Sequence, residues 1–163
     1  MKTLLLLRHA KASRDDPELD DRDRPLKPRG KEDAKRLGRR LRVAGLVPTL
    51  IVSSTALRAR KTASKVAKQM NYARAIELNP RLYLSNPNDH LEVVRSVRDT
   101  EDRVMIVGHN PGLSQFLNEL ADTEAELATC DLAQIELPFN HWTELEKSAC
   151  AKLIQVWHAG DGD

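Results

Sequence analysis

Two arginines and two histidines follow short aliphatic runs, and these residue types together suit the chemistry of a bound phosphoryl group. Arg8 and His9 follow a run of four leucines, His109 follows a second apolar run, and Arg58 follows a third. A guanidinium binds phosphate oxygens through paired charged hydrogen bonds, and a neutral imidazole is a competent nucleophile near neutral pH. A second, protonated histidine could stabilise the oxygens of a phosphoryl group in transfer.

The aliphatic runs have the length of buried strands, and they predict where the polar residues lie. The runs cover residues 3–7, 50–52 and 103–107. A charge inside a buried strand costs several kcal/mol unless it is paired. At the C-terminal end of a strand the same charge is tolerated, and open α/β sheets place their ligand sites there. We therefore expect Arg8 and His9 at the mouth of a pocket formed by several strand ends.

The rest of the chain alternates between helix and strand patterns. A helix is expected from Pro28, which suits the first helical position, to a closing Gly45. Asn110 and Pro111 are expected to cap and begin a later helix. The other expected elements are helices over 56–70, from Pro87 and over 113–120, a weak strand over 75–78, and antiparallel strands over 132–137 and 149–157.

This order of elements predicts one α/β domain that spans residues 1–163. It should be a three-layer sandwich with a mostly parallel central sheet, helices on both faces and an antiparallel edge from the C-terminal segment. Residues 10–27 form a long polar stretch, and long ordered loops are often functional. Its carboxylates are candidate proton donors or shapers of the pocket: Asp15, Asp20 and Asp21.

The composition excludes several classes of function. The net charge of +2 is too small to indicate nucleic-acid binding, and an aromatic content of 4% disfavours stacking on single strands. No apolar run has the length of a membrane span, and the leucine run is too short for a signal peptide, so a cytoplasmic protein is expected. Cys130 and Cys150 have no metal-type partners nearby in the sequence and are expected to be reduced and buried.

Several segments resemble, in order, the motifs of the histidine phosphatase superfamily, also called the phosphoglycerate-mutase-like superfamily. Leu7-Arg8-His9-Ala10 resembles its Arg-His-Gly signature, and the segment 53–63 resembles its Ser-Pro-x-x-Arg-Ala-x-x-Thr-Ala block. The segment 107–110 resembles its Gly-His block. The segment 21–30 matches the Arg-Pro-Leu-x-x-x-Gly stretch of the short branch that contains the SixA-type phosphohistidine phosphatases.

The resemblance implies a role for each matching residue. His9 would be the nucleophile that forms a phosphohistidine intermediate, while Arg8, Arg58 and His109 would hold the phosphoryl oxygens. Arg24 would contact the substrate at the pocket mouth, or form an ordinary loop ion pair. The family works without a metal or another cofactor. Larger members carry an acid after the third strand, where this chain has no carboxylate until position 89.

The expected substrate is a phosphorylated protein, such as a histidine phosphotransfer domain, because an imidazole leaving group needs less help from an acid. Two alternatives remain open: a phosphatase of small phosphorylated metabolites and a non-catalytic phosphate-binding or interaction module. The basic helix face over 35–42 is either solvated or docks an acidic partner. The remaining histidines, at 90, 141 and 158, are expected to be structural or exposed to solvent.

Overall fold

The computed structural model describes residues 1–147 and 151–161. Within them, a six-stranded sheet has the order β3-β2-β4-β1-β5-β6. The four strands β1 to β4 are parallel, while β5 is antiparallel to β1 and β6 is antiparallel to β5. The strands are β1 (Lys2–Arg8), β2 (Leu50–Ser53), β3 (Glu77–Leu78), β4 (Arg103–Gly108), β5 (Leu132–Leu137) and β6 (Lys152–Trp157).

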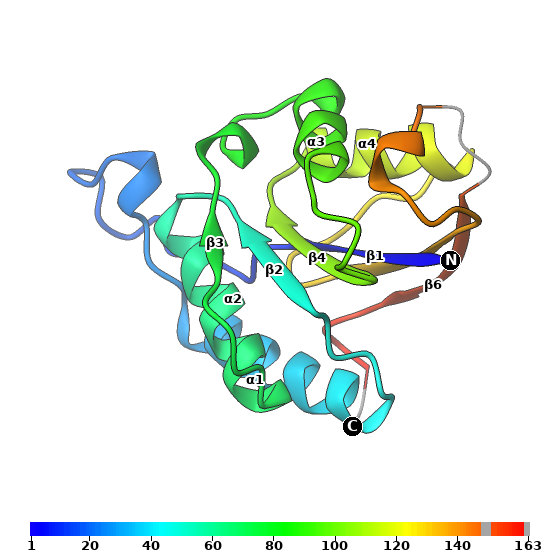
Figure 1. Cartoon of the computed structure of the whole chain (residues 1–163). Helices are drawn as coiled ribbons and strands as arrows, with labels where there is room; N and C mark the ends of the chain where they lie inside the picture. Colours follow the sequence, from blue (N-terminus) through cyan, green and yellow to red (C-terminus); the bar gives the residue numbers. More distant parts are fainter. Residues whose placement is uncertain (148–150, 162–163) are drawn as a thin grey trace.

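Helices cover both faces of the sheet, as Figure 1 shows. Helices α1 and α2 lie against one face, and α3 and α4 lie against the other. Short 3-10 helices cover Asp21–Asp23, Pro80–Leu82 and Trp142–Glu144. The α-helices are α1 (Pro28–Val43), α2 (Leu57–Met70), α3 (Pro87–Arg95) and α4 (Gly112–Ala121).

The four leucines of β1 explain why the sheet lies between two layers of helices. Successive side chains of a strand point to opposite faces. Leu4 and Leu6 accordingly join the core formed with α3 and α4, whereas Leu5 and Leu7 join the core formed with α1 and α2. All four are fully buried. The expected α/β sandwich with an antiparallel C-terminal edge is therefore confirmed.

The helix ends follow the local sequence closely, with one exception. Pro28 is the first residue of α1, and Gly45 follows the helix with a φ of 71°, a conformation that suits glycine. Helix α4 begins at Gly112, so the prediction that Pro111 is its first helical residue was wrong by one position. The Asn110 side chain still acts as a cap, because its Oδ1 accepts from the backbone N–H of Ser114.

The two ends of the sheet differ from the sequence pattern in detail. The weak strand expected over 75–78 is only two residues long, Glu77–Leu78. The last strand begins at Lys152, and positions 149 and 150 of the expected strand lie outside the described residues. Cys130 is buried as a free thiol, while Cys150 is not described.

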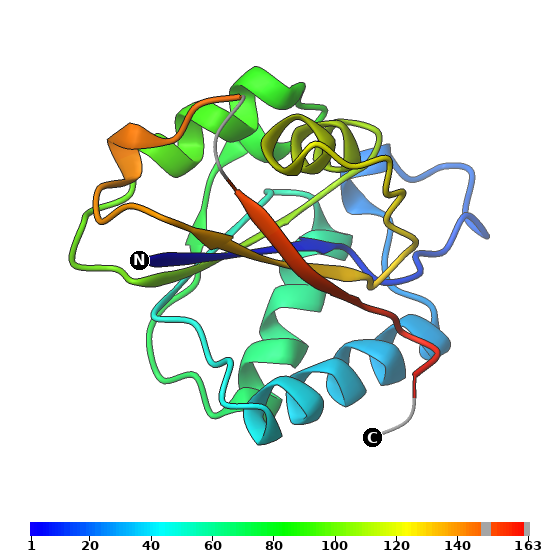
Figure 2. The same ribbon diagram turned by 90° about the vertical axis from the view of Figure 1, so that its right-hand side faces the viewer.

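The basic face of α1 is only partly a solvated surface. Figure 2 shows the chain leaving β6 and running down to α1. There Arg36 donates to the carbonyl of Ala159, and Arg40 donates to that of His158 and lies over the Trp157 ring. These two cations therefore bind the C-terminal segment. Among the described residues, no helix is both long enough and apolar enough to cross a membrane.

Candidate active site

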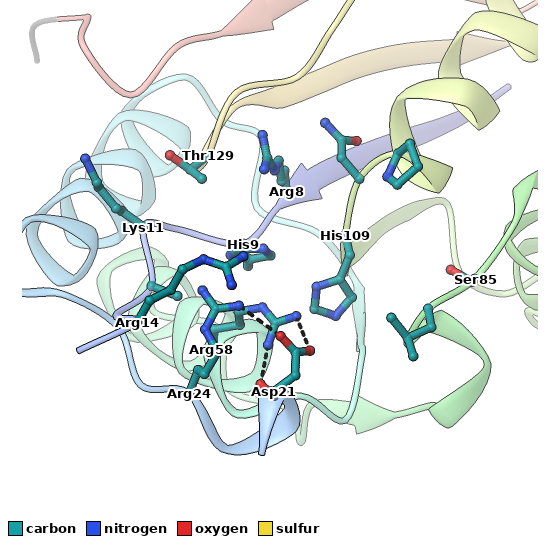
Figure 3. A pocket seen from close by; sticks show the side chains of 14 residues that line it. Arg8, His9, Lys11, Arg14, Asp21, Arg24, Arg58, Ser85, His109 and Thr129 are labelled. Carbon is teal, nitrogen blue, oxygen red and sulfur yellow. Dashed lines mark hydrogen bonds and ion pairs between the residues drawn. The ribbon is translucent and has the colours of Figure 1, made fainter. Parts of the chain in front are cut away.

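The C-terminal ends of β1, β2 and β4 meet at one edge of the sheet, because the three strands are parallel and adjacent. A pocket of about 600 Å³ opens there. Its lining includes all five residues that the sequence singled out for a phosphate site (Figure 3): Arg8, His9, Arg24, Arg58 and His109.

His9 is held at the end of β1 with one ring nitrogen engaged. Its Nδ1 lies 2.8 Å from the carbonyl oxygen of Ala10. A carbonyl can only accept, so Nδ1 carries the proton and Nε2 is unprotonated in the neutral ring. The next backbone N–H, that of Ala10, donates to the Thr62 hydroxyl of α2. Burial, together with the charges of Arg58 and Arg8, lowers the pKa of His9 to about 4.

His109 is also buried, and its pKa is lowered as that of His9 is. Burial and the neighbouring His9 and Arg58 lower the pKa of His109 to about 3. Its Nε2 lies 2.7 Å from the hydroxyl of Ser54, which also accepts from the backbone N–H of Ala56. The hydroxyl hydrogen has no other acceptor in the described part of the chain, so it is directed at Nε2. The proton of His109 therefore sits on Nδ1.

Three of the buried side-chain polar atoms that lack a hydrogen-bond partner within the described residues belong to pocket residues. They are the Nε of Arg8, the Nε of Arg58 and the Nδ1 of His109, while two others, the hydroxyl of Thr55 and the Nε of Arg103, lie outside the pocket lining. A buried donor that lacks an acceptor costs about 1–3 kcal/mol. The same side chains are otherwise well anchored, since Arg8 donates to the carbonyl of Leu127. Their unpaired groups suit an anion with several acceptor oxygens.

Asp21 is the one candidate carboxylate of the long loop that lines the pocket. Its side chain accepts from Arg24, Arg58 and Tyr83, and its backbone carbonyl accepts from Arg58 as well. The hydrogen bond from Tyr83, followed by those from Arg24 and Arg58, holds the pKa of Asp21 well below its usual range. Asp21 is therefore ionised at neutral pH and shapes the pocket. Asp15 and Asp20 do not line it.

Sequence reasoning missed two side chains of this site. Ser54 orients His109 from the end of β2, and Tyr83 packs edge-on against the His109 ring at 5.6 Å between centroids. Of the other histidines, His90 is buried against Phe116, whereas His141 and His158 are exposed and pair with Asp99 and Asp131.

The low pKa values predict that the protein loses stability as pH falls from 6.5 toward 4. The unfolded chain protonates its histidines below pH 6.5, whereas folded His9 and His109 stay neutral until about pH 4 and about pH 3. The stability they contribute is thus complete above pH 6.5 and is lost on acidification. At about pH 4.5 the loss is about 3 kcal/mol for each histidine. Urea unfolding at about pH 7 and about pH 4.5 measures it.

A matched variant separates this effect from the titration of carboxylates. The double substitution His9→Gln and His109→Gln removes both titrations and should flatten this part of the stability profile. An unchanged slope in the variant would show that the two histidines are not responsible.

The comparisons with known proteins agree with this geometry. A family model described as the histidine phosphatase superfamily (branch 1) matches residues 4–83. A chloroplastic protein of Arabidopsis thaliana is 34% identical over 152 residues, which cover 88% of this chain and 70% of that protein. A protein of Mycobacterium tuberculosis is 32% identical over 159 residues, which cover 91% of this chain and 96% of that protein.

Solved structures of SixA proteins have the same fold. The SixA protein of Nakamurella multipartitia is 28% identical, with a TM-score of 0.82 over 96% of this chain and 95% of that chain. The SixA protein of Agrobacterium tumefaciens is 25% identical, with a TM-score of 0.81 over 96% of this chain and 97% of that chain.

Fold, motifs and relatives together define an enzyme of the histidine-dependent phosphatase class. The chain belongs to the histidine phosphatase superfamily, and within it the chain is similar to the SixA-like branch.

Proposed function

We propose that this phosphatase hydrolyses phosphohistidine on proteins and that His9 is its nucleophile. One observation carries the proposal: the Nδ1 of His9 is engaged by the Ala10 carbonyl, which leaves Nε2 unprotonated in a pocket lined by Arg8, Arg58 and His109. An in-line attack needs such a free nitrogen lone pair beside groups that stabilise the phosphoryl oxygens.

The reaction would proceed in two steps. In the first, the Nε2 lone pair of His9 forms a bond to phosphorus, the bond from phosphorus to the substrate nitrogen breaks, and the departing imidazole takes up a proton from solvent. In the second, water attacks the phosphorus, the bond to His9 breaks with its electron pair returning to Nε2, and the proton lost by the water passes to solvent as inorganic phosphate is released. Both steps balance without a redox partner.

Arg8, Arg58 and His109 would hold the phosphoryl oxygens. The support for these roles is the set of buried donors without protein acceptors on these three side chains. His109 would act as a neutral donor through Nδ1, with Ser54 fixing that tautomer. Arg24 would contribute less to the substrate, because it already donates to Asp21 and to the carbonyl of Ser13.

Phosphohistidine fits this pocket better than an alkyl phosphate ester does. The pocket's carboxylate, Asp21, is ionised at neutral pH and has no proton to donate to an alkoxide leaving group. An imidazole leaving group is more easily expelled. The SixA proteins of similar fold are provisionally named phosphohistidine phosphatases. The partner would therefore be a phosphorylated protein, such as a phosphotransfer domain.

Turnover of two substrate types tests the proposal. We expect kcat/KM for a phosphohistidine protein to exceed that for sugar phosphates and nucleotide monophosphates by at least about 100-fold, equivalent to about 3 kcal/mol of transition-state stabilisation. Inorganic phosphate release measures both. A preference for the small esters would instead establish a small-molecule phosphomonoesterase.

A further inference from the structure

The pocket is larger than a phosphoryl group needs, and a second cavity shares part of its lining. The first cavity has a volume of about 600 Å³ and the second about 340 Å³. Lys11 and Thr129 line both of them. Cavities of this size hold ligands far larger than a single phosphate. The substrate can therefore make contacts well beyond its phosphoryl group.

The positive charge of the pocket exceeds what the phosphoryl site uses. Five cationic side chains line the first cavity, against a single carboxylate, Asp21, which already binds Arg24 and Arg58. Two of the five, Lys11 and Arg14, are exposed and make no ion pair or side-chain hydrogen bond within the described residues. Figure 3 shows both on the side of His9 away from His109.

The backbone that carries these two cations is fixed against the start of α1. The carbonyl of Lys11 accepts from the N–H of Lys27, and a Cβ added to Gly30 would lie 2.3 Å from the same oxygen. The carbonyl of Ser13, next to Arg14, accepts from Arg24, while its N–H donates to Pro25. A ligand that binds here does not have to order the loop first.

The lining of the second cavity is mixed in charge. Arg29 lines it with three-quarters of its side chain exposed, and its carboxylate neighbour, Asp33, is 3.9 Å away. Two buried acids, Asp33 and Asp131, also line that cavity, and Asp131 is bound by the N–H of Ala128 and by His158. The unpaired positive charge therefore lies in the first cavity, at Lys11 and Arg14.

We propose that Lys11 and Arg14 form a second anion-binding subsite for acidic side chains of the substrate protein that flank its phosphorylated residue. This inference rests on the proposed function. An extended acidic segment can place its phosphoryl group at His9 and its carboxylates beside Lys11 and Arg14, which a small phosphate ester cannot do. The subsite would select among phosphorylated proteins by charge. Arg8, Arg58 and His109 would bind the phosphoryl group, which all of these proteins carry.

Two phosphohistidine peptides that differ only in their flanking residues test the subsite. One carries two Glu on each side of the phosphohistidine and the other carries Gln at the same positions. At about 20 mM salt, we expect kcat/KM of the wild-type protein to favour the Glu peptide about fivefold to tenfold. The preference should shrink at about 300 mM salt, because exposed charges are screened. The double variant Lys11→Met and Arg14→Met should lose the preference and turn over the two peptides at equal rates.

The control variant removes two exposed cations at the far ends of α1 and α2, through Arg42→Met and Lys68→Met. It should keep the full preference. Equal turnover of both peptides by the wild-type protein would overturn the inference, as would an equal loss of preference in the control. Turnover of neither peptide, with a small phosphate ester still hydrolysed, would overturn the proposed function and this inference together.

Discussion

Replacing His9 with Ala is expected to lower kcat/KM at least about 10⁴-fold and to abolish the phosphoenzyme. No other ring nitrogen in the pocket can replace it, because the Nε2 of His109 accepts from Ser54 and its Nδ1 carries the proton. The phosphoenzyme is measured by acid-free quenching of a reaction with radiolabelled phosphohistidine protein. The label on the wild-type protein should be acid-labile and stable to alkali, as expected for a bond between phosphorus and nitrogen.

The exposed His141 offers a matched control for this experiment. His141 pairs with Asp99 at the surface and does not line the pocket, so His141→Ala should keep normal activity and normal labelling. Full turnover by the His9→Ala protein, or a label that persists on it, would contradict the assignment of His9 as the nucleophile.

The sheet could be predicted from the sequence because its signals are local. The leucines of β1 and the apolar run of β4 are long enough to be recognised as buried strands. Parallel pairing then brings their C-terminal ends to one edge. The side chains after those ends, Arg8, His9 and His109, were placed in one pocket by this reasoning alone. The fold is the one that the solved SixA structures share.

The contacts that tune the site could not be predicted, because they join distant parts of the chain. Asp21 meets Tyr83 from 62 residues away, and Ser54 meets His109 from 55 residues away. The neutral state of His109 follows from burial, which no local pattern reveals. Likewise, the sequence of the basic face of α1 could not predict that Arg36 and Arg40 bind the C-terminal segment.

The same arginines that suit a phosphate also lower the pKa of His9, the proposed nucleophile. Burial is the largest cause of the low pKa of His9, and Arg58 and Arg8 lower it further. The positive charge that would attract a phosphoryl dianion thus keeps the imidazole unprotonated before the substrate arrives. Once the dianion neutralised that charge, the imidazole would become more basic and bind phosphorus more readily. In the proposed mechanism, attraction of the substrate and activation of His9 are therefore one electrostatic effect.

Replacing Arg58 with Met tests this coupling and is expected to lower kcat/KM by about 10²- to 10³-fold, the usual cost of one lost charge-stabilising donor. Arg58→Lys should not restore activity. A single ammonium cannot bind both the carbonyl oxygen and the Oδ2 of Asp21 and still offer paired donors to the phosphoryl group. The Arg58→Met protein should also bind tungstate more weakly than the wild-type protein, as measured by calorimetry. Because Arg58 lowers the pKa of His9 and His109, the acid limb of kcat/KM should move to higher pH.

Arg60→Met, which removes an exposed cation in the same turn of α2, is the matched control. An unchanged acid limb in the Arg58→Met protein, or an equal shift in the Arg60→Met protein, would show that Arg58 does not tune the histidines.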